Sequence, residues 1–129
     1  MKYAHVCYRV FDIDRSVEFY CGALGFKELK RYPIRDAAVN VDVAPEGSED
    51  RPLELTYNFG QTEPYEIGTG YGHIAYIVDN LDGTLGNLAA IGIDPEKPPY
   101  SIREGGSRIC FVRDPDGYRI ELIEKHAGD

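Results

Sequence analysis

Several features that would define a class of protein are scarce in this chain. No apolar run reaches the roughly 18 residues that a transmembrane helix needs, so the sequence predicts no membrane span. Lys and Arg number 14 against 22 Asp and Glu, and the net charge of −8 argues against nucleic acid or an anionic membrane surface as a partner. The N-terminus becomes polar at Arg9 and Asp12, which leaves no room for a signal peptide.

Cysteine is scarce as well. Cys7, Cys21 and Cys110 are odd in number and lack the spacing of a metal or redox motif, so we expect reduced thiols with packing roles and a cytoplasmic location. Hydrophobic residues make up 43% of the chain, without low-complexity tracts. This composition predicts a globular protein, and 129 residues are the length of one domain.

The most informative feature is an internal repeat that covers nearly the whole chain. Segments 5–10 and 73–78 share His, Tyr and Val in the same register. Segments 53–55 and 120–122 each place a Glu between two aliphatic residues. Each half therefore opens with a His and ends with a Glu about 50 residues later, which predicts two modules in one domain spanning 1–129.

Each module is predicted to be a β-α-β-β-β unit, at about 1–60 and 68–125, joined by a Gly-rich linker at about 60–72. In the first module we expect strands at 4–10, 26–32, 37–43 and 53–59, with a helix capped by Asp14 and ended by Gly25. The second module should repeat this order, with a helix capped by Asp82 and ended by Gly92. Residues 94–108 read as an irregular loop, and Asp114-Pro115-Asp116-Gly117 as a hairpin turn. The predicted class is α+β.

The two His and two Glu residues share an unusual position. By the period-2 rule, His5, His73, Glu54 and Glu121 all lie on the strand faces opposite the apolar ones. A carboxylate is costly to bury, so each Glu is either on a wet face or bound to something. A solvent-exposed face explains the alternation of polar and apolar residues, but not the recurrence of His and Glu at the same positions in both modules. Imidazole and carboxylate ligands suit Ni²⁺, Co²⁺, Zn²⁺ or Fe²⁺, and four ligands leave two positions open in an octahedral shell.

The chain resembles the vicinal oxygen chelate superfamily, and within it the short bacterial type of glyoxalase I (lactoylglutathione lyase). The most specific matches are Leu-Glu-Leu-Thr-Tyr-Asn at 53–58, Gly-His-Ile at 72–74 and Asp-Pro-Asp-Gly-Tyr-Arg-Ile-Glu at 114–121. The resemblance implies paired βαβββ modules and a homodimer with sites at the subunit interface. There, His5 and Glu54 of one subunit would hold a cation together with His73 and Glu121 of the other.

The resemblance also implies an activity. The methylglyoxal–glutathione hemithioacetal would be isomerised to S-lactoylglutathione by proton transfer through an enediolate, with a cation as Lewis acid. Glu121 is the expected base, and Glu54 the other candidate. The resemblance implies Ni²⁺ or Co²⁺ as the most active cation, with Zn²⁺ as the alternative. Glutathione is the expected co-substrate.

Alternatives stay open at this point. The same chemistry can use another thiol, such as trypanothione or bacillithiol. Other proteins of the superfamily are epimerases, which carry Gln where this chain has Glu54, dioxygenases, which use two His and one carboxylate, and non-catalytic binding proteins, which usually lack the full ligand set.

The resemblance also implies residues that would bind the thiol. Arg9 and Asn58 match positions that the family uses for glutathione, and Lys97, Arg103 and Arg108 are further candidates in or beside the long loop. The longer eukaryotic enzymes have an Arg near position 69, where this chain has Thr69. Three aromatic residues are candidates for the methyl pocket or for the core: Phe11, Tyr57 and Phe59.

Overall fold

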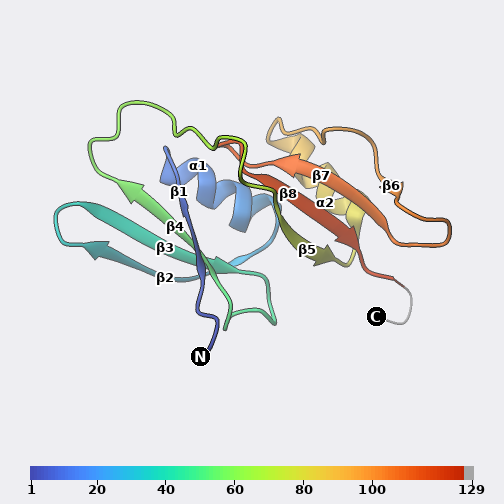
Figure 1. Cartoon of the computed structure of the whole chain (residues 1–129), viewed down its shortest axis with the longest axis horizontal. Helices are drawn as coiled ribbons and strands as arrows, with labels where there is room; N and C mark the ends of the chain where they lie inside the picture. The colour runs from blue at the N-terminus through green and yellow to red at the C-terminus, as the bar shows by residue number, and fades with distance from the viewer. Residues whose placement is uncertain (127–129) are drawn as a thin grey trace. The chain divides into compact units, whose positions relative to one another are not determined.

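The computed structural model describes residues 1–126 and divides the chain into two compact units, Met1–Glu66 and Ile67–Asp129. The boundary falls inside the Gly-rich segment 60–72. Each unit contains one four-stranded sheet and helical structure (Figure 1). None of the helices in residues 1–126 is long and apolar enough to cross a membrane.

Unit 1 follows the predicted β-α-β-β-β order. Its elements are β1 (Val6–Arg9), α1 (Ile13–Val17), the π-helical η1 (Glu18–Ala23), β2 (Lys27–Ile34), β3 (Ala38–Ala44) and β4 (Leu53–Asn58). The strand order is β1-β4-β3-β2. Strand β1 runs parallel to β4, while β3 is antiparallel to both β4 and β2. The first and last strands of the unit are therefore neighbours.

Unit 2 repeats this topology. Its elements are β5 (Ile74–Val78), α2 (Leu81–Ala90), β6 (Tyr100–Ser101), β7 (Arg108–Arg113) and β8 (Arg119–Glu124). The order β5-β8-β7-β6, with β5 parallel to β8, matches that of unit 1 strand for strand. The segment 94–108 is less irregular than the sequence indicates, because its short strand β6 pairs with β7.

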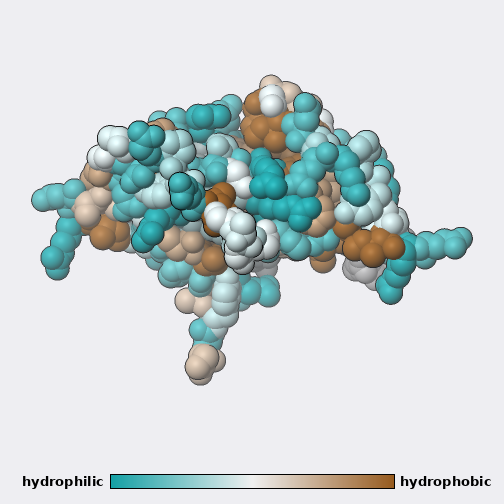
Figure 2. All heavy atoms as spheres, turned by 45° about the horizontal axis from the view of Figure 1, so that its top comes forward, coloured by the Kyte–Doolittle hydropathy of each residue, from teal (hydrophilic) through white to brown (hydrophobic). Residues whose placement is uncertain are grey.

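Each sheet buries one face against its own helices. In unit 1 the buried set includes Tyr8, Val41, Leu53 and Leu55 with Phe19, Tyr20 and Phe26; in unit 2 it includes Leu81 and Leu88 with Cys110, Val112, Ile120 and Leu122. These are the apolar positions of the period-2 and helical patterns. Figure 2 shows hydrophilic residues over most of the visible surface, with hydrophobic side chains in separate patches. The opposite face of the unit 1 sheet carries mainly polar and titratable residues, whereas that of unit 2 combines Glu121 and Arg119 with the apolar Ile109, Phe111 and Ile123.

The predicted helix caps were wrong by a few residues. Helix α1 is capped by Asp12, whose Oδ1 accepts hydrogen bonds from the backbone N–H groups of Asp14 and Arg15. Helix α2 is capped by Asn80, whose Oδ1 accepts from the N–H of Gly83 at 2.9 Å. A Cβ at Gly83 would lie 2.8 Å from the Asn80 amide nitrogen, so this glycine makes room for the cap. Asp14 and Asp82 instead lie in the first helical turns, where negative charge is favourable.

The turn before β8 forms as the sequence predicts. Gly117 has a φ of 94°, and its N–H donates to the Asp114 carbonyl at 2.9 Å. The buried Asp114 carboxylate accepts from the N–H groups of Asp116 and Tyr118. This turn fixes where β8 begins, and so where Glu121 falls in the sheet.

Candidate functional site

In unit 1, strand register brings His5 and Glu54 together. Strand β1 pairs with β4 so that Cys7 is the partner of Glu54, and His5 lies just before β1 on the same alternation. The His5 Nε2 is 3.5 Å from Glu54 Oε2. The Glu54 side chain is 13% exposed and that of His5 is 43% exposed. The carboxylate is thus largely buried beside an accessible imidazole.

Unit 2 builds the same pair from the same register. Ala75 of β5 is the partner of Glu121 on β8, and His73 precedes β5. The His73 Nε2 lies 3.2 Å from Glu121 Oε1, with side-chain exposures of 36% and 14%. The repeat seen in the sequence therefore corresponds to two copies of one His–Glu arrangement.

Both pairs have the spacing of two ligands on one cation. Ligands about 2.1 Å from a metal lie roughly 3.0 Å apart at a right angle and roughly 3.4 Å apart at a tetrahedral angle. The His73–Glu121 separation of 3.2 Å falls within this span, and the His5–Glu54 separation of 3.5 Å lies just above it. Within residues 1–126 no group of three or more His, Cys, Asp or Glu side chains is arranged to hold a metal. Each unit thus presents two fitting donors, and a complete site needs further ligands.

Glu54 is embedded in a hydrogen-bonded network that sequence analysis missed. The Tyr32 hydroxyl donates to Glu54 Oε2 at 3.3 Å, and the Asn40 amide donates to the Tyr32 oxygen at 3.3 Å. The Thr56 hydroxyl donates to Asn40 Oδ1 at 2.8 Å and lies 3.2 Å from the Cys7 sulfur. The alternation of Val39, Val41 and Val43 already placed Asn40 on the opposite, polar face, so the signal was present in the sequence.

Asp42 is a further residue beside Glu54 that was not predicted from the sequence. The two are direct partners across β3 and β4, so their side chains share a face. Asp42 is only 6% exposed, and its Oδ2 lies 3.7 Å from the Lys30 ammonium. Burial raises the pKa of the Asp42 carboxyl; the charge of Glu54 adds to the rise, and Lys30 and His5 oppose it.

The surroundings of Glu121 are different. Its direct partner on β7 is Phe111, whose ring meets the His73 ring edge to face at 5.1 Å between centroids. The Arg119 guanidinium lies 3.7 Å from the centre of the Phe111 ring and donates hydrogen bonds to both carboxylate oxygens of Glu96. These bonds hold the pKa of the Glu96 carboxyl below its usual value, an effect to which the charges of Arg119 and Arg113 add.

The predicted thiol-binding residues fall in separate places. Arg9 is the β-sheet partner of Thr56, and Asn58 lies one alternation beyond Thr56 on β4, so both share the face of Glu54. The Asn58 amide donates to the Tyr65 hydroxyl at 3.0 Å. In unit 2, the Lys97 ammonium lies 3.9 Å from the centre of the Tyr100 ring.

The remaining loop cations have other surroundings. Arg103 lines a pocket of about 290 Å³ with Ile102, Gly106 and Ser107. Arg108 binds Asp82 and Glu124, which links α2 to β8. Roles in thiol binding remain predictions for Arg9, Asn58, Lys97 and Arg103.

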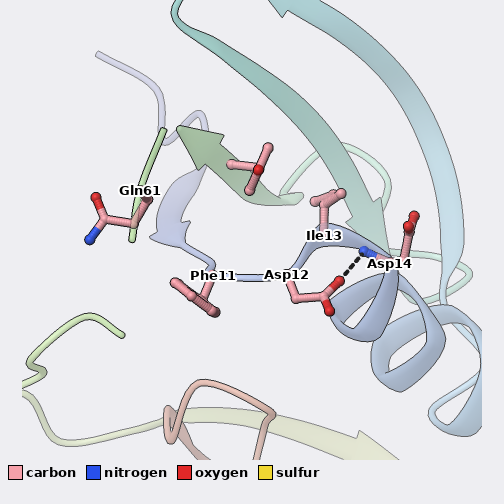
Figure 3. Close-up of a pocket in the computed structure, with 6 residues that line it drawn as sticks. Phe11, Asp12, Ile13, Asp14 and Gln61 are labelled. Atoms are coloured by element: carbon pink, nitrogen blue, oxygen red, sulfur yellow. Dashed lines mark hydrogen bonds between the residues drawn. The ribbon is translucent and has the colours of Figure 1, made fainter. Parts of the chain in front are cut away.

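A second pocket lies at the start of α1. It has a volume of about 410 Å³ and is lined by Phe11, Asp12, Ile13, Asp14, Tyr57 and Gln61 (Figure 3). Tyr57 alternates with Glu54 and Asn58 along β4, so it faces away from the His5–Glu54 pair. Phe59 packs against the Tyr57 ring at 5.7 Å and is half exposed. Of the two roles considered for Tyr57, methyl pocket or core, this orientation favours the core, and the methyl-pocket role stays a prediction.

Comparison with known proteins identifies a matching family model and similar proteins. The family model described as the Glyoxalase/Bleomycin resistance protein/Dioxygenase superfamily matches residues 2–122. The chain is 40% identical over 132 residues to the lactoylglutathione lyase of Escherichia coli O157:H7, covering 99% of this chain and 96% of that protein. It is 39% identical over 127 residues to the lactoylglutathione lyase GLX1 of Arabidopsis thaliana.

Relatives differ in length. The match to the Arabidopsis protein covers 96% of this chain but only 44% of that protein, so the chain spans less than half of this plant relative. The crystal structure of glyoxalase I from Zea mays superposes with a TM-score of 0.85 at 34% identity, covering 96% of this chain and 44% of the maize chain. The fold of the two units is thus that of the glyoxalase structures.

Proposed function

Because the chain belongs to the Glyoxalase/Bleomycin resistance protein/Dioxygenase superfamily, we propose that it is a metal-dependent glyoxalase I, a lactoylglutathione lyase. The observation that carries the proposal is the His–Glu pair that both units form at a spacing suited to one cation. Relatives named lactoylglutathione lyase at about the same length, such as the Escherichia coli protein, support the same activity.

The proposed site combines the His–Glu pair of unit 1 with the His–Glu pair of unit 2. His5 and Glu54 of one copy and His73 and Glu121 of a second copy would hold one divalent cation, Ni²⁺ or Co²⁺ in preference to Zn²⁺, in a homodimer. Two ligands per unit support this division, since neither pair alone fills a coordination shell. When bound, the cation supplies positive charge that stabilises negative charge on the substrate oxygens.

The proposed reaction is a shift of hydrogen between neighbouring carbons. The substrate is the hemithioacetal of methylglyoxal and glutathione, and the product is S-lactoylglutathione. A carboxylate takes the proton from the carbon that carries sulfur and returns it to the adjacent carbon, while the hydroxyl proton passes from the oxygen of the first carbon to that of the second, so no external oxidant or reductant takes part.

Glu121 is assigned as the base. The Tyr32 hydroxyl donates to Glu54 and fixes its orientation, which favours the role of a steady ligand. Glu121 instead has the apolar Phe111 as its direct partner on β7, and its side chain is 14% exposed, which leaves an edge that a substrate can reach. A largely water-free carboxylate is well suited to accept a proton from carbon.

The thiol would be anchored by positive and amide groups. Arg9 and Asn58 share the face of Glu54, and Lys97 and Arg103 are the candidates from unit 2. Glutathione carries two carboxylates, which Arg side chains bind well. A cytoplasmic location is part of the same proposal, since glutathione is the reductant there; the three cysteines are free thiols, as is common in reducing compartments.

Metal reconstitution tests the proposal. Protein stripped by a chelator is titrated with Ni²⁺, Co²⁺ and Zn²⁺ while thioester absorbance is followed, with hemithioacetals made from glutathione, trypanothione and bacillithiol. We expect no turnover without metal, the highest rate with Ni²⁺ or Co²⁺, and a preference for glutathione. Failure to form thioester with every metal and thiol rejects the proposed activity.

A further inference from the structure

Asp42 Oδ1 stands out among the polar atoms on the sheet face of unit 1. It is buried and has no hydrogen-bond partner within the part of the chain that the structure describes. Carboxylate oxygens without a donor are unfavourable in a protein interior, so such an oxygen marks a place for a group supplied from outside. Its position across from Glu54 places it beside the proposed reaction centre.

The neighbouring polar groups are already paired with one another. Tyr32, Asn40, Thr56 and Cys7 form one connected series of contacts that ends on Glu54. None of these contacts involves Asp42. The face is therefore a built polar surface rather than a row of solvated side chains, and Asp42 is the acceptor within it that still needs a donor.

The required donor is a neutral one. The Lys30 ammonium is 3.7 Å from Asp42 Oδ2, so a positive charge is already near the carboxylate. A hydroxyl group can donate to Oδ1 without adding a second charge. The Lys30 side chain is 65% exposed and comes from the outer strand β2, so it has the freedom to move aside when a ligand enters.

Asp42 and the proposed thiol-binding residues lie in different directions from Glu54. Thr56 and Asn58 follow Glu54 along β4 on the same face, and Arg9 lies beside Thr56 on the neighbouring strand β1. Asp42 lies across the sheet instead, on the β3 side of Glu54. A substrate whose thiol part extends along the strands toward Arg9 and Asn58 leaves the β3 side of Glu54, where Asp42 lies, available to its other substituent.

We propose that Asp42, with Tyr32 and Asn40 beside it, forms a subsite for a hydroxyl-bearing substituent, so that the same reaction proceeds with higher kcat/KM on hydroxylated 2-oxoaldehydes than on methylglyoxal. This inference rests on the proposed function and names the substrate class of the same site. Asp42 acts as a specificity determinant, because its carboxylate accepts a hydrogen bond that a methyl group cannot donate. A site that hydrogen-bonds a substrate hydroxyl discriminates strongly against analogues without it.

Turnover provides the first test. The Ni²⁺-loaded full chain is assayed with glutathione hemithioacetals of methylglyoxal and of hydroxypyruvaldehyde, which differ by one hydroxyl. We expect kcat/KM to favour the hydroxylated substrate by about tenfold or more. Asp42→Leu should reduce this preference to about twofold or less, and Asp42→Asn, which keeps an acceptor oxygen, should retain part of it. Equal preference in the wild type and the folded Asp42→Leu variant overturns the subsite.

Binding provides a second readout that does not depend on turnover. Calorimetric titration of the Ni²⁺-loaded protein compares three chelating probes: acetohydroxamate, glycolohydroxamate, which adds a hydroxyl, and glycine hydroxamate, which adds an ammonium. We expect glycolohydroxamate to bind about tenfold more tightly than acetohydroxamate, and Asp42→Leu to remove the difference. Tighter binding of the ammonium probe, or no difference between the first two, overturns the hydroxyl assignment.

A matched control removes the same charge elsewhere in unit 1. Asp50 is exposed and pairs with Arg51, so Asp50→Asn should leave both ratios at wild-type values. The two assays also separate the inference from the proposed function. If the wild type converts neither hemithioacetal but still prefers glycolohydroxamate, the lyase activity is rejected while the subsite stands.

Discussion

The two units share a fold and a His–Glu pair but surround the pair with different chemistry. In unit 1 the residue across from the Glu is the buried Asp42, beside a network of Tyr, Asn and Thr side chains that ends on Glu54. In unit 2 the corresponding residue is Phe111, covered by the Arg119 guanidinium. The pair depends on the register between the first and last strands of a unit, while the third strand is free to vary.

This difference suggests a division of labour. The network around Glu54 holds that carboxylate in place and supplies polar groups, whereas the residue across from Glu121 is the apolar Phe111; the two carboxylates are equally shielded, at 13% and 14% exposed. In a duplicated fold, one unit can thus hold a metal ligand in position while the other unit transfers the proton.

The largest expected effect distinguishes the two carboxylates. Glu121→Gln should lower kcat by about 10²–10⁴-fold even at saturating metal, because a proton acceptor is lost. Glu54→Gln should mainly weaken metal affinity, and excess Ni²⁺ should restore part of its activity. Steady-state kinetics with metal analysis measures both, with circular dichroism as the folding control. Recovery of Glu121→Gln by excess metal would reverse the assignment.

The next prediction asks whether the pairs meet across a dimer. His5→Ala and His73→Ala should each abolish metal-dependent turnover as homodimers. If each site combines unit 1 of one copy with unit 2 of another, a mixed dimer of the two variants keeps one intact site. Random mixing after dissociation should therefore restore about a quarter of wild-type activity. No restoration in mixtures whose exchange is confirmed by mass spectrometry would contradict a shared site.

A smaller effect is expected at the thiol anchor of unit 1. Arg9→Ala should raise KM for the glutathione hemithioacetal by about tenfold with little change in kcat, because binding to a glutathione carboxylate is lost in ground and transition states alike. Arg51→Ala removes an exposed positive charge elsewhere in the unit and should leave KM unchanged. Wild-type KM in Arg9→Ala would exclude Arg9 from the thiol site.

Stability should respond to pH with opposite signs in the two units. The folded-state pKa of Asp42 is raised, so its ionisation makes the folded state less favourable as pH rises above the unfolded-state value. Asp42→Asn should therefore stabilise the protein by about 1 kcal/mol near pH 7. The gain should shrink in acid, where Asp42 is protonated anyway. Thermal unfolding as a function of pH measures the effect, and a pH-independent gain would contradict this account.

The smallest effect concerns Glu96 in unit 2. Its folded-state pKa is lowered, so the stability it contributes is present above its unfolded-state pKa and is lost as pH falls through the folded-state value. Glu96→Gln should cost about 0.5 kcal/mol near neutral pH, as for other partly exposed ion pairs. The cost should disappear in strong acid. Comparing its unfolding curve with that of Asp42→Asn checks the difference in sign.

Much of the architecture was predictable from sequence because it follows from local periodicity. Alternation located the strands of both units, and the turn at 114–117 formed as predicted. The caps were misplaced because several Asx residues precede each helix, and only backbone geometry selects Asp12 and Asn80. Strand β6 escaped prediction because its two residues have no periodicity of their own.

The sequence by itself determined that His5, Glu54, His73 and Glu121 alternate with the buried apolar positions, since a period of two and a duplicated pattern are local properties. Only the tertiary structure decided which of these side chains meet. Parallel pairing of β1 with β4 and of β5 with β8 brings each His to its Glu, and antiparallel pairing of β3 with β4 brings Asp42 beside Glu54. Such neighbours depend on the register between distant strands, which is fixed by burial of the opposite face and by long-range hydrogen bonds.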